Sequence, residues 1–103
     1  MIAQFKKGIL EMAVLYTVAQ GDTYGYELMN TVKAHFSDTY EGTIYTILRR
    51  LAQDECVETY EGAVSGGPKR KYYKITKKGE EILRDMLNWW QEINNAIKSM
   101  GIR

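Results

Sequence analysis

The sequence has few of the residue types that build metal sites, disulfides and membrane spans. Its 103 residues include one cysteine, Cys56, and one histidine, His35. A single cysteine excludes an internal disulfide and the usual zinc sites, and a single histidine leaves little room for metal or triad chemistry. No apolar run approaches the length that spans a bilayer, and the amino terminus lacks a signal-peptide pattern. We therefore expect a soluble, cytoplasmic protein without a cofactor.

The chain also has little net charge, but the charges that it has are unevenly spread. Fourteen basic residues stand against 13 acidic ones, a formal net charge of +1. Six basic residues and no acidic one lie between Lys69 and Lys78, whereas residues 41–61 carry five acids against Arg49 and Arg50. A local basic stripe on a near-neutral protein is compatible with nucleic-acid binding and predicts modest non-specific affinity.

The apolar content of 45% is typical of a globular chain, and its length of one domain. Residues 7–20 read as a helix that is apolar on nearly every side, ended by Gly21. One small domain can cover one side of such a helix, so we expect a second subunit to cover the other. A second helix is predicted at residues 24–36, with Thr23 as its N-cap.

A third helix, from Gly42 to about residue 52, has two contrasting faces. Ile44, Ile47, Leu48 and Leu51 recur at helical spacing and predict a buried face. Hydroxyl and guanidinium groups on the remaining surface can reach phosphates and base edges. The residues predicted to contact DNA on this helix are Thr43, Tyr45, Thr46, Arg49 and Arg50.

Beyond Cys56 the apolar period changes from helical to alternating, which predicts two strands joined by a Gly-rich turn. The second strand covers residues 71–76, and the tip of the hairpin covers residues 65–70. Lys69, Arg70 and Lys71 are predicted to hold DNA phosphates. Gly62 and Gly67 have the separation found in nucleotide-phosphate loops, but Pro68 stands where that motif needs lysine, so we reject this alternative.

The last helix is predicted from Lys77 to about Met100, with Thr76 as its N-cap. Its apolar residues form an a/d seam typical of helix pairing, with a second row at Ile82, Trp89 and Ala96. The seam, and hence the predicted dimer interface, consists of Leu83, Met86, Trp90, Ile93, Ile97 and Met100. Large aromatic side chains at this spacing are usually core. The alternative is a slot for a flat aromatic or cationic effector, formed by Trp90, Trp89, Met86 and Ile93.

The order of elements predicts a mainly α fold with a small β-hairpin: a winged helix-turn-helix followed by a long C-terminal dimerisation helix. We assign residues 1–76 to the DNA-binding domain and residues 77–103 to the dimerisation helix, which forms one compact unit with the first helix.

Several stretches also resemble one family of regulators. Residues 23–28 (TYGYEL), 42–45 (GTIY), 48–51 (LRRL) and 66–79 (GGPKRKYYKITKKG) are similar to those of PadR family transcriptional regulators. The single C-terminal helix resembles the small members of that family. The resemblance implies a dimeric protein, usually a repressor, that in some members responds to small aromatic or cationic compounds. The family often has glycine before the first long strand, where this chain has Glu55 and Cys56, so a different junction is expected there.

Two alternatives to a DNA-binding repressor belong to other functional classes. A winged-helix module can bind protein instead of DNA, but the basic residues 69–71 argue against that alternative. An enzyme would need a catalytic group, a metal set or a phosphate cradle, and the sequence offers none of these.

Overall fold

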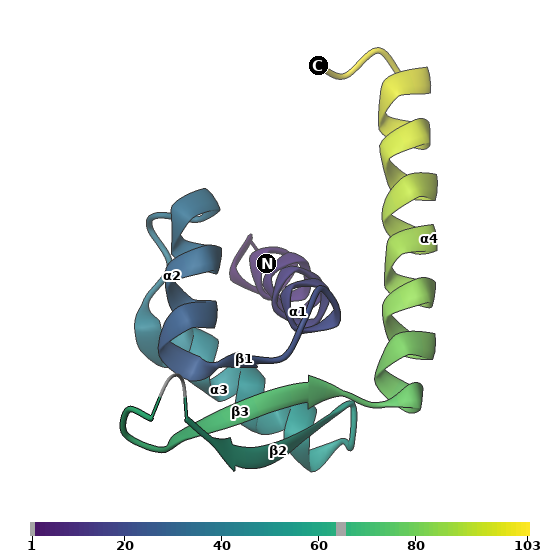
Figure 1. Cartoon of the computed structure of the whole chain (residues 1–103). Helices are drawn as coiled ribbons and strands as arrows, with labels where there is room; N and C mark the ends of the chain where they lie inside the picture. Colours follow the sequence, from purple (N-terminus) through teal and green to yellow (C-terminus); the bar gives the residue numbers. More distant parts are fainter. Residues whose placement is uncertain (1, 64–65) are drawn as a thin grey trace.

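A computed structural model of the chain describes residues 2–63 and 66–103, and only the backbone of Ile2. In these residues, four helices and three short strands follow one another (Figure 1). They are α1 (Ile2–Ala19), β1 (Thr23–Tyr24), α2 (Gly25–His35), α3 (Glu41–Gln53), β2 (Val57–Gly62), β3 (Arg70–Ile75) and α4 (Lys77–Ser99). The fold is the predicted winged helix-turn-helix with a long last helix. The predicted tip of the wing, residues 65–70, begins at a residue outside those described.

The hydrophobic core gathers one face of each helix around α1, which lies between α2 and α4 in Figure 1. The predicted apolar face of α3 is confirmed, because Ile44, Ile47, Leu48 and Leu51 are all buried. Those side chains pack with residues of α1, α2 and the sheet, including Leu10, Val14, Leu15, Val18, Leu28, Met29, Val32, Val57 and Tyr73. Burying one face of α3 in this way fixes which of its residues face outward.

The sheet has three strands in the order β1-β3-β2, so it is larger than the predicted hairpin. β2 and β3 pair antiparallel from Val57 opposite Ile75 to Gly62 opposite Arg70. β1 adds Thr23 opposite Tyr73 and Tyr24 opposite Tyr72. Side chains alternate between the two faces of a strand, so this register separates an inner face, which carries buried Tyr73, from an outer face, which carries Tyr72.

The start of α2 differs from the sequence prediction. Thr23 is not an N-cap; it lies in β1, and its hydroxyl donates to Glu27 Oε1 at 2.7 Å. The N-cap position is taken by Tyr24, whose side chain makes no capping hydrogen bond. Pairing with β3 holds residues 23 and 24 extended, and this tertiary contact prevails over the local preference of threonine for capping.

The start of α4 agrees with the prediction. The Thr76 hydroxyl accepts a hydrogen bond from the Gly79 backbone N–H at 3.0 Å, as an N-cap does. The same hydroxyl lies 2.7 Å from the Glu55 carbonyl oxygen and 3.0 Å from that of Cys56, and donates toward them. These contacts tie α4 to the loop before β2. From there α4 passes beside α1, and its C-terminal half extends beyond the other elements (Figure 1).

The link between α2 and α3 is held by an ion pair from α1. Lys6 Nζ lies 2.9 Å from Asp38 Oδ2. The lysine hydrogen bond and charge lower the pKa of the Asp38 carboxyl.

Within the described residues, every helix is too short or too polar to cross a membrane.

Candidate nucleic-acid interface

The side of α3 that faces away from the core carries most of the residues predicted to bind DNA. Thr46 and Arg49 are exposed, Thr43 is half-buried, and Tyr45 is 37% exposed. The buried side chains fix the rotation of α3 about its own axis, and this rotation directs Thr43, Tyr45, Thr46 and Arg49 away from the core.

A hollow of about 390 Å³ lies between α3 and β3. Arg49 borders it from the helix, and Lys71 borders it from the wing, with Tyr45, Ala52, Gln53 and Tyr73 completing the wall. Two cations from elements that are distant in sequence therefore face one space. Such a pair suits an anion of the size and charge of a DNA phosphate.

Arg50 does not belong to this hollow. It borders a separate space of about 240 Å³ on the side of α1 and α4, together with Glu11, Asp54, Cys56 and Lys78. Successive helical residues point about 100° apart, so Arg49 and Arg50 face different partners. The second space combines acids with bases, and burial raises the pKa of the Cys56 thiol there.

The three basic residues of the wing also point in different directions. Lys69 is exposed just before β3. The Arg70 guanidinium lies over the Tyr24 ring, 4.7 Å from its centroid, on the outer face of the sheet. The Lys71 ammonium lies 5.7 Å from the Tyr73 centroid, on the inner face beside α3. The predicted basic tip is thus two sites on opposite faces of the wing.

Three tyrosines line the outer face of the sheet, one from each strand. Tyr72 stacks on Tyr60, with ring centroids 5.5 Å apart, and meets Tyr24 edge-on at 5.6 Å. The Tyr60 hydroxyl donates to Asp22 Oδ2 at 2.6 Å, which raises the pKa of Tyr60. Sequence reasoning missed this cluster, since it assigned Tyr24 to a helix. Tyr60 and Tyr72 both lie in the predicted strands, and a cross-strand pairing of the two was the signal that could have indicated part of the cluster.

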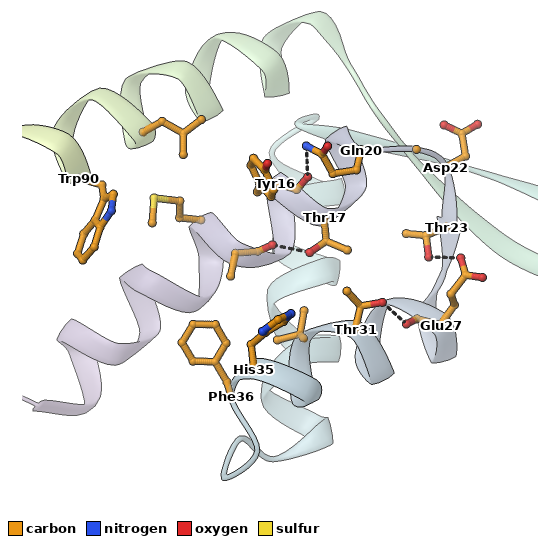
Figure 2. A pocket seen from close by; sticks show the side chains of 15 residues that line it. Tyr16, Thr17, Gln20, Asp22, Thr23, Glu27, Thr31, His35, Phe36 and Trp90 are labelled. Carbon is orange, nitrogen blue, oxygen red and sulfur yellow. Dashed lines mark hydrogen bonds between the residues drawn. The ribbon is translucent and has the colours of Figure 1, made fainter.

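A groove of about 660 Å³ runs between α1, α2 and α4. Figure 2 shows Trp90 at one end, Tyr16, Phe36 and His35 along the sides, and Asp22 at the other end. The walls are mainly apolar, and Asp22 and Glu27 supply carboxylates.

The predicted seam of α4 divides between the core and the surface. Leu83 is 7% exposed and belongs to the core of its own chain, so it has little surface left for a partner. Met86 packs partly against the same core. Ile93 and Ile97 are half-buried, and Met100 is 76% exposed.

The predicted effector residues do not lie together within one chain. Trp90 is 37% exposed and borders the groove between α1, α2 and α4. Met86 borders the space near Cys56 instead. Trp89 is 48% exposed, and neither it nor Ile93 is among the residues that line the groove.

Among the described residues, no group of three or more histidine, cysteine, aspartate or glutamate side chains is arranged to hold a metal ion.

Comparison with known proteins identifies the family. Residues 14–85 match the transcriptional regulator PadR-like family. A PadR-like transcriptional regulator from Bacillus cereus is 39% identical, with a TM-score of 0.87 over 94% of this chain and 95% of that one. A Streptococcus transcriptional regulator is 32% identical, with a TM-score of 0.89 over 95% and 97% of the two chains. An uncharacterised protein of Lysinibacillus sphaericus is 34% identical over 88% of this chain and 86% of its own. The match covers the helix-turn-helix, the wing and the start of α4, so this chain belongs to the PadR-like family of DNA-binding transcriptional regulators.

Proposed function

We propose that the protein is a homodimeric repressor, which binds an operator through α3 and the wing and releases it when a small aromatic or cationic compound binds. Residues 1–76 make the DNA contacts, and residues 77–103 join the subunits. The observation that supports the DNA contacts most strongly is the hollow that Arg49 and Lys71 border from two different elements.

The DNA-binding residues have different roles in this proposal. Thr43, Tyr45, Thr46 and Arg49 lie on the helix that enters the major groove, where side chains reach base edges. Lys69, Arg70 and Lys71 contact the sugar-phosphate backbone, on both faces of the wing. Arg50 faces α1 and α4, so we assign it a phosphate at the flank of the site.

Binding to DNA tests this division. Operator candidates come from the DNA upstream of the protein's own gene and from selection out of a random library. Lys69→Ala should lower the slope of log K against log salt by about one unit on every sequence. Arg49→Ala should cost about 1–3 kcal/mol on the selected sequence and reduce discrimination, as expected for a guanine contact.

Lys98→Ala is the matched control, because Lys98 is an exposed base near the far end of α4. It should leave both the salt slope and the discrimination unchanged. Equal losses for Lys69→Ala and Arg49→Ala on selected and random DNA would contradict the division of roles.

The apolar surface of α4 and α1 supports the dimer. The large side chains exposed along α1 and α4 include Tyr16, Leu87, Trp90 and Met100. Tyr16, Leu87 and Trp90 border the groove between α1, α2 and α4. A second copy packed along α4 would remove this surface from water, which is the main driving force of association.

Ile93→Asp should abolish the dimer, because it places a charge in the half-buried seam. Asn95→Asp adds the same charge at an exposed position of α4 and should leave the dimer intact. Sedimentation at several protein concentrations separates the two results. A dimeric Ile93→Asp variant would place the interface elsewhere.

The groove between α1, α2 and α4 supports an effector site. Trp90, Tyr16 and Phe36 offer aromatic surface, and Asp22 and Glu27 offer negative charge at the other end (Figure 2). Flat cations bind such combinations by stacking and by charge. The partner subunit would cover the exposed part of Trp90, so a ligand that binds the two dimer geometries unequally would change the spacing of the α3 helices.

Titration with flat cationic dyes, followed by tryptophan fluorescence, tests the effector site. Trp90→Ala should abolish binding, whereas Trp89→Ala, which removes a tryptophan outside the groove, should retain it. Binding that persists in dimeric Trp90→Ala would exclude this site.

A further inference from the structure

Gly25, the first residue of α2, lies beneath the ring of Tyr45. A Cβ atom built on Gly25 would be 2.9 Å from Tyr45 Cε1, 3.7 Å from Cζ and 3.6 Å from the hydroxyl oxygen. The outer half of the ring therefore occupies the space that any other residue at position 25 would fill.

The backbone does not explain the glycine. Among the described residues, the glycines with positive φ are Gly66 and Gly101, so Gly25 has a conformation that other residues adopt as readily. Glycine also leaves the unfolded chain more conformational freedom than alanine does, so it lowers the free energy of unfolding where alanine could be accommodated without strain. In its present position, the ring of Tyr45 leaves no room for a side chain at residue 25.

Tyr45 connects this contact to the proposed DNA surface. Besides covering Gly25, it borders the hollow between α3 and β3 that Arg49 and Lys71 also border. Its side chain is 37% exposed. Held by α2, the ring is restricted in its rotamers before DNA arrives, and a restricted side chain loses less entropy on binding.

We propose that Gly25 is a positioning residue for DNA recognition: its missing side chain lets α2 hold the Tyr45 ring in its place beside Arg49 and Lys71. This inference rests on the proposed role of Tyr45 in sequence preference. It adds a residue of α2 that acts on specificity through another side chain and needs no DNA contact of its own.

Gly25→Ala separates positioning from stability. The atoms that the new methyl group would meet are the far end of a partly exposed side chain, which can rotate toward solvent. The fold should therefore be kept, with a melting temperature equal to or above that of the wild type. The displaced ring should lower discrimination between the selected DNA and a scrambled sequence by about two- to tenfold.

A double-mutant cycle shows whether Gly25 acts through Tyr45. Tyr45→Ala alone should reduce discrimination, and adding Gly25→Ala to it should have no further effect. Gly8→Ala is the matched control, because it is a helical glycine whose added Cβ would have no neighbour within 4 Å. It should leave discrimination unchanged.

The ring contact itself is measured without DNA. Nuclear Overhauser effects between the Tyr45 ring and the Gly25 α-protons are expected in the wild type, and their absence would overturn the proposal even if Gly25→Ala failed to fold. Unchanged discrimination in Gly25→Ala, or an equal loss with and without Tyr45, would overturn it as well.

Failure of the proposed function gives different results. If the wild type selects no sequence from the library, both proposals fall. If the wild type discriminates and Tyr45→Ala discriminates equally well, the repressor proposal stands but the role of Tyr45, and with it the positioning by Gly25, is wrong.

Discussion

Gly79→Ala is expected to destabilise the fold, because Gly79 lies where α4 approaches the chain just before β2. Its backbone N–H donates to the Thr76 hydroxyl at 3.0 Å, and the residue is buried. An added Cβ would collide with the carbonyl oxygen of Cys56 and lie 3.0 Å from its carbonyl carbon and 2.9 Å from Ile75 Cγ1. Backbone atoms cannot rotate away as the end of a side chain can, so α4 has to shift.

The expected loss follows from three contributions. Replacing glycine by alanine within a helix gains up to about 1 kcal/mol. Overpacking of this kind costs about 1–3 kcal/mol. Moving α4 also weakens the two hydrogen bonds, both 3.0 Å, that Thr76 donates to the Cys56 carbonyl, each worth about 1 kcal/mol. The net loss should be about 2 kcal/mol, or roughly 8–16 °C in Tm for a domain of this size.

Thermal and urea unfolding at one fixed protein concentration measure this loss, since association would otherwise shift the Tm. Gly8→Ala in α1 meets no atom within 4 Å and should gain stability, by up to about 1 kcal/mol. If Gly79→Ala were as stable as the wild type, or gained as much as Gly8→Ala, the close approach of α4 to Cys56 would be wrong.

Three further predictions concern the same junction and the wing. Thr76→Ala should cost about 1 kcal/mol in urea unfolding through loss of the N-cap, and Thr76→Ser should recover most of it. Glu55, whose φ is 61°, should be replaceable by glycine with a gain of about 0.5–1 kcal/mol, because side chains raise the energy of that conformation; a loss would contradict the left-handed geometry. The hydrogen bond to Asp22 is the main cause that raises the pKa of Tyr60 in the folded state. This hydrogen bond should therefore contribute to the free energy of unfolding below about pH 10, and the contribution should be lost as the pH rises through the folded-state pKa. NMR titration of the tyrosine rings should show the Tyr60 pKa falling in Asp22→Ala.

The sequence predicts the elements that carry a strong apolar period. The buried face of α3 and the N-cap at Thr76 are confirmed because each depends on residues close together in the chain. β1 was not predicted, because two residues are too few to show an alternating apolar pattern and threonine is a preferred N-cap residue. Its strand conformation depends on pairing with Tyr73, far along the sequence.

The arrangement of the candidate site was predictable in part. The residues of the α3 surface follow from helical spacing alone. The shared hollow of Arg49 and Lys71 depends on how the wing packs beside α3, which no local pattern contains. The opposite directions of Arg70 and Lys71 do follow from strand alternation, once the strand is known to begin at Arg70.

At the junction before β2, the sequence shows that glycine is absent, but it does not show which backbone conformation Glu55 adopts. The resemblance to PadR family regulators implies glycine before this strand, where the sequence has Glu55. The structure shows that Glu55 adopts a positive φ of 61°, a conformation that glycine adopts most readily. The hydrogen bond from the Thr76 hydroxyl to the Glu55 carbonyl helps to hold this conformation, and it comes from a residue 21 positions further along the chain, which no pattern around Glu55 contains.

The pairing of β1 with β3 affects the order in which parts of the protein can fold during synthesis. Thr23 and Tyr24 precede their partners Tyr73 and Tyr72 by about 50 residues. At a synthesis rate of about 5–20 residues per second, the ribosome completes β3 roughly 3–10 s after it completes β1. During that time α1, α2 and α3 can form, but the extended segment that begins α2 has no strand to pair with. The helix-turn-helix therefore reaches its final form only after the wing has been synthesised, and a chain shortened before residue 70 would lack the contact that fixes the start of α2.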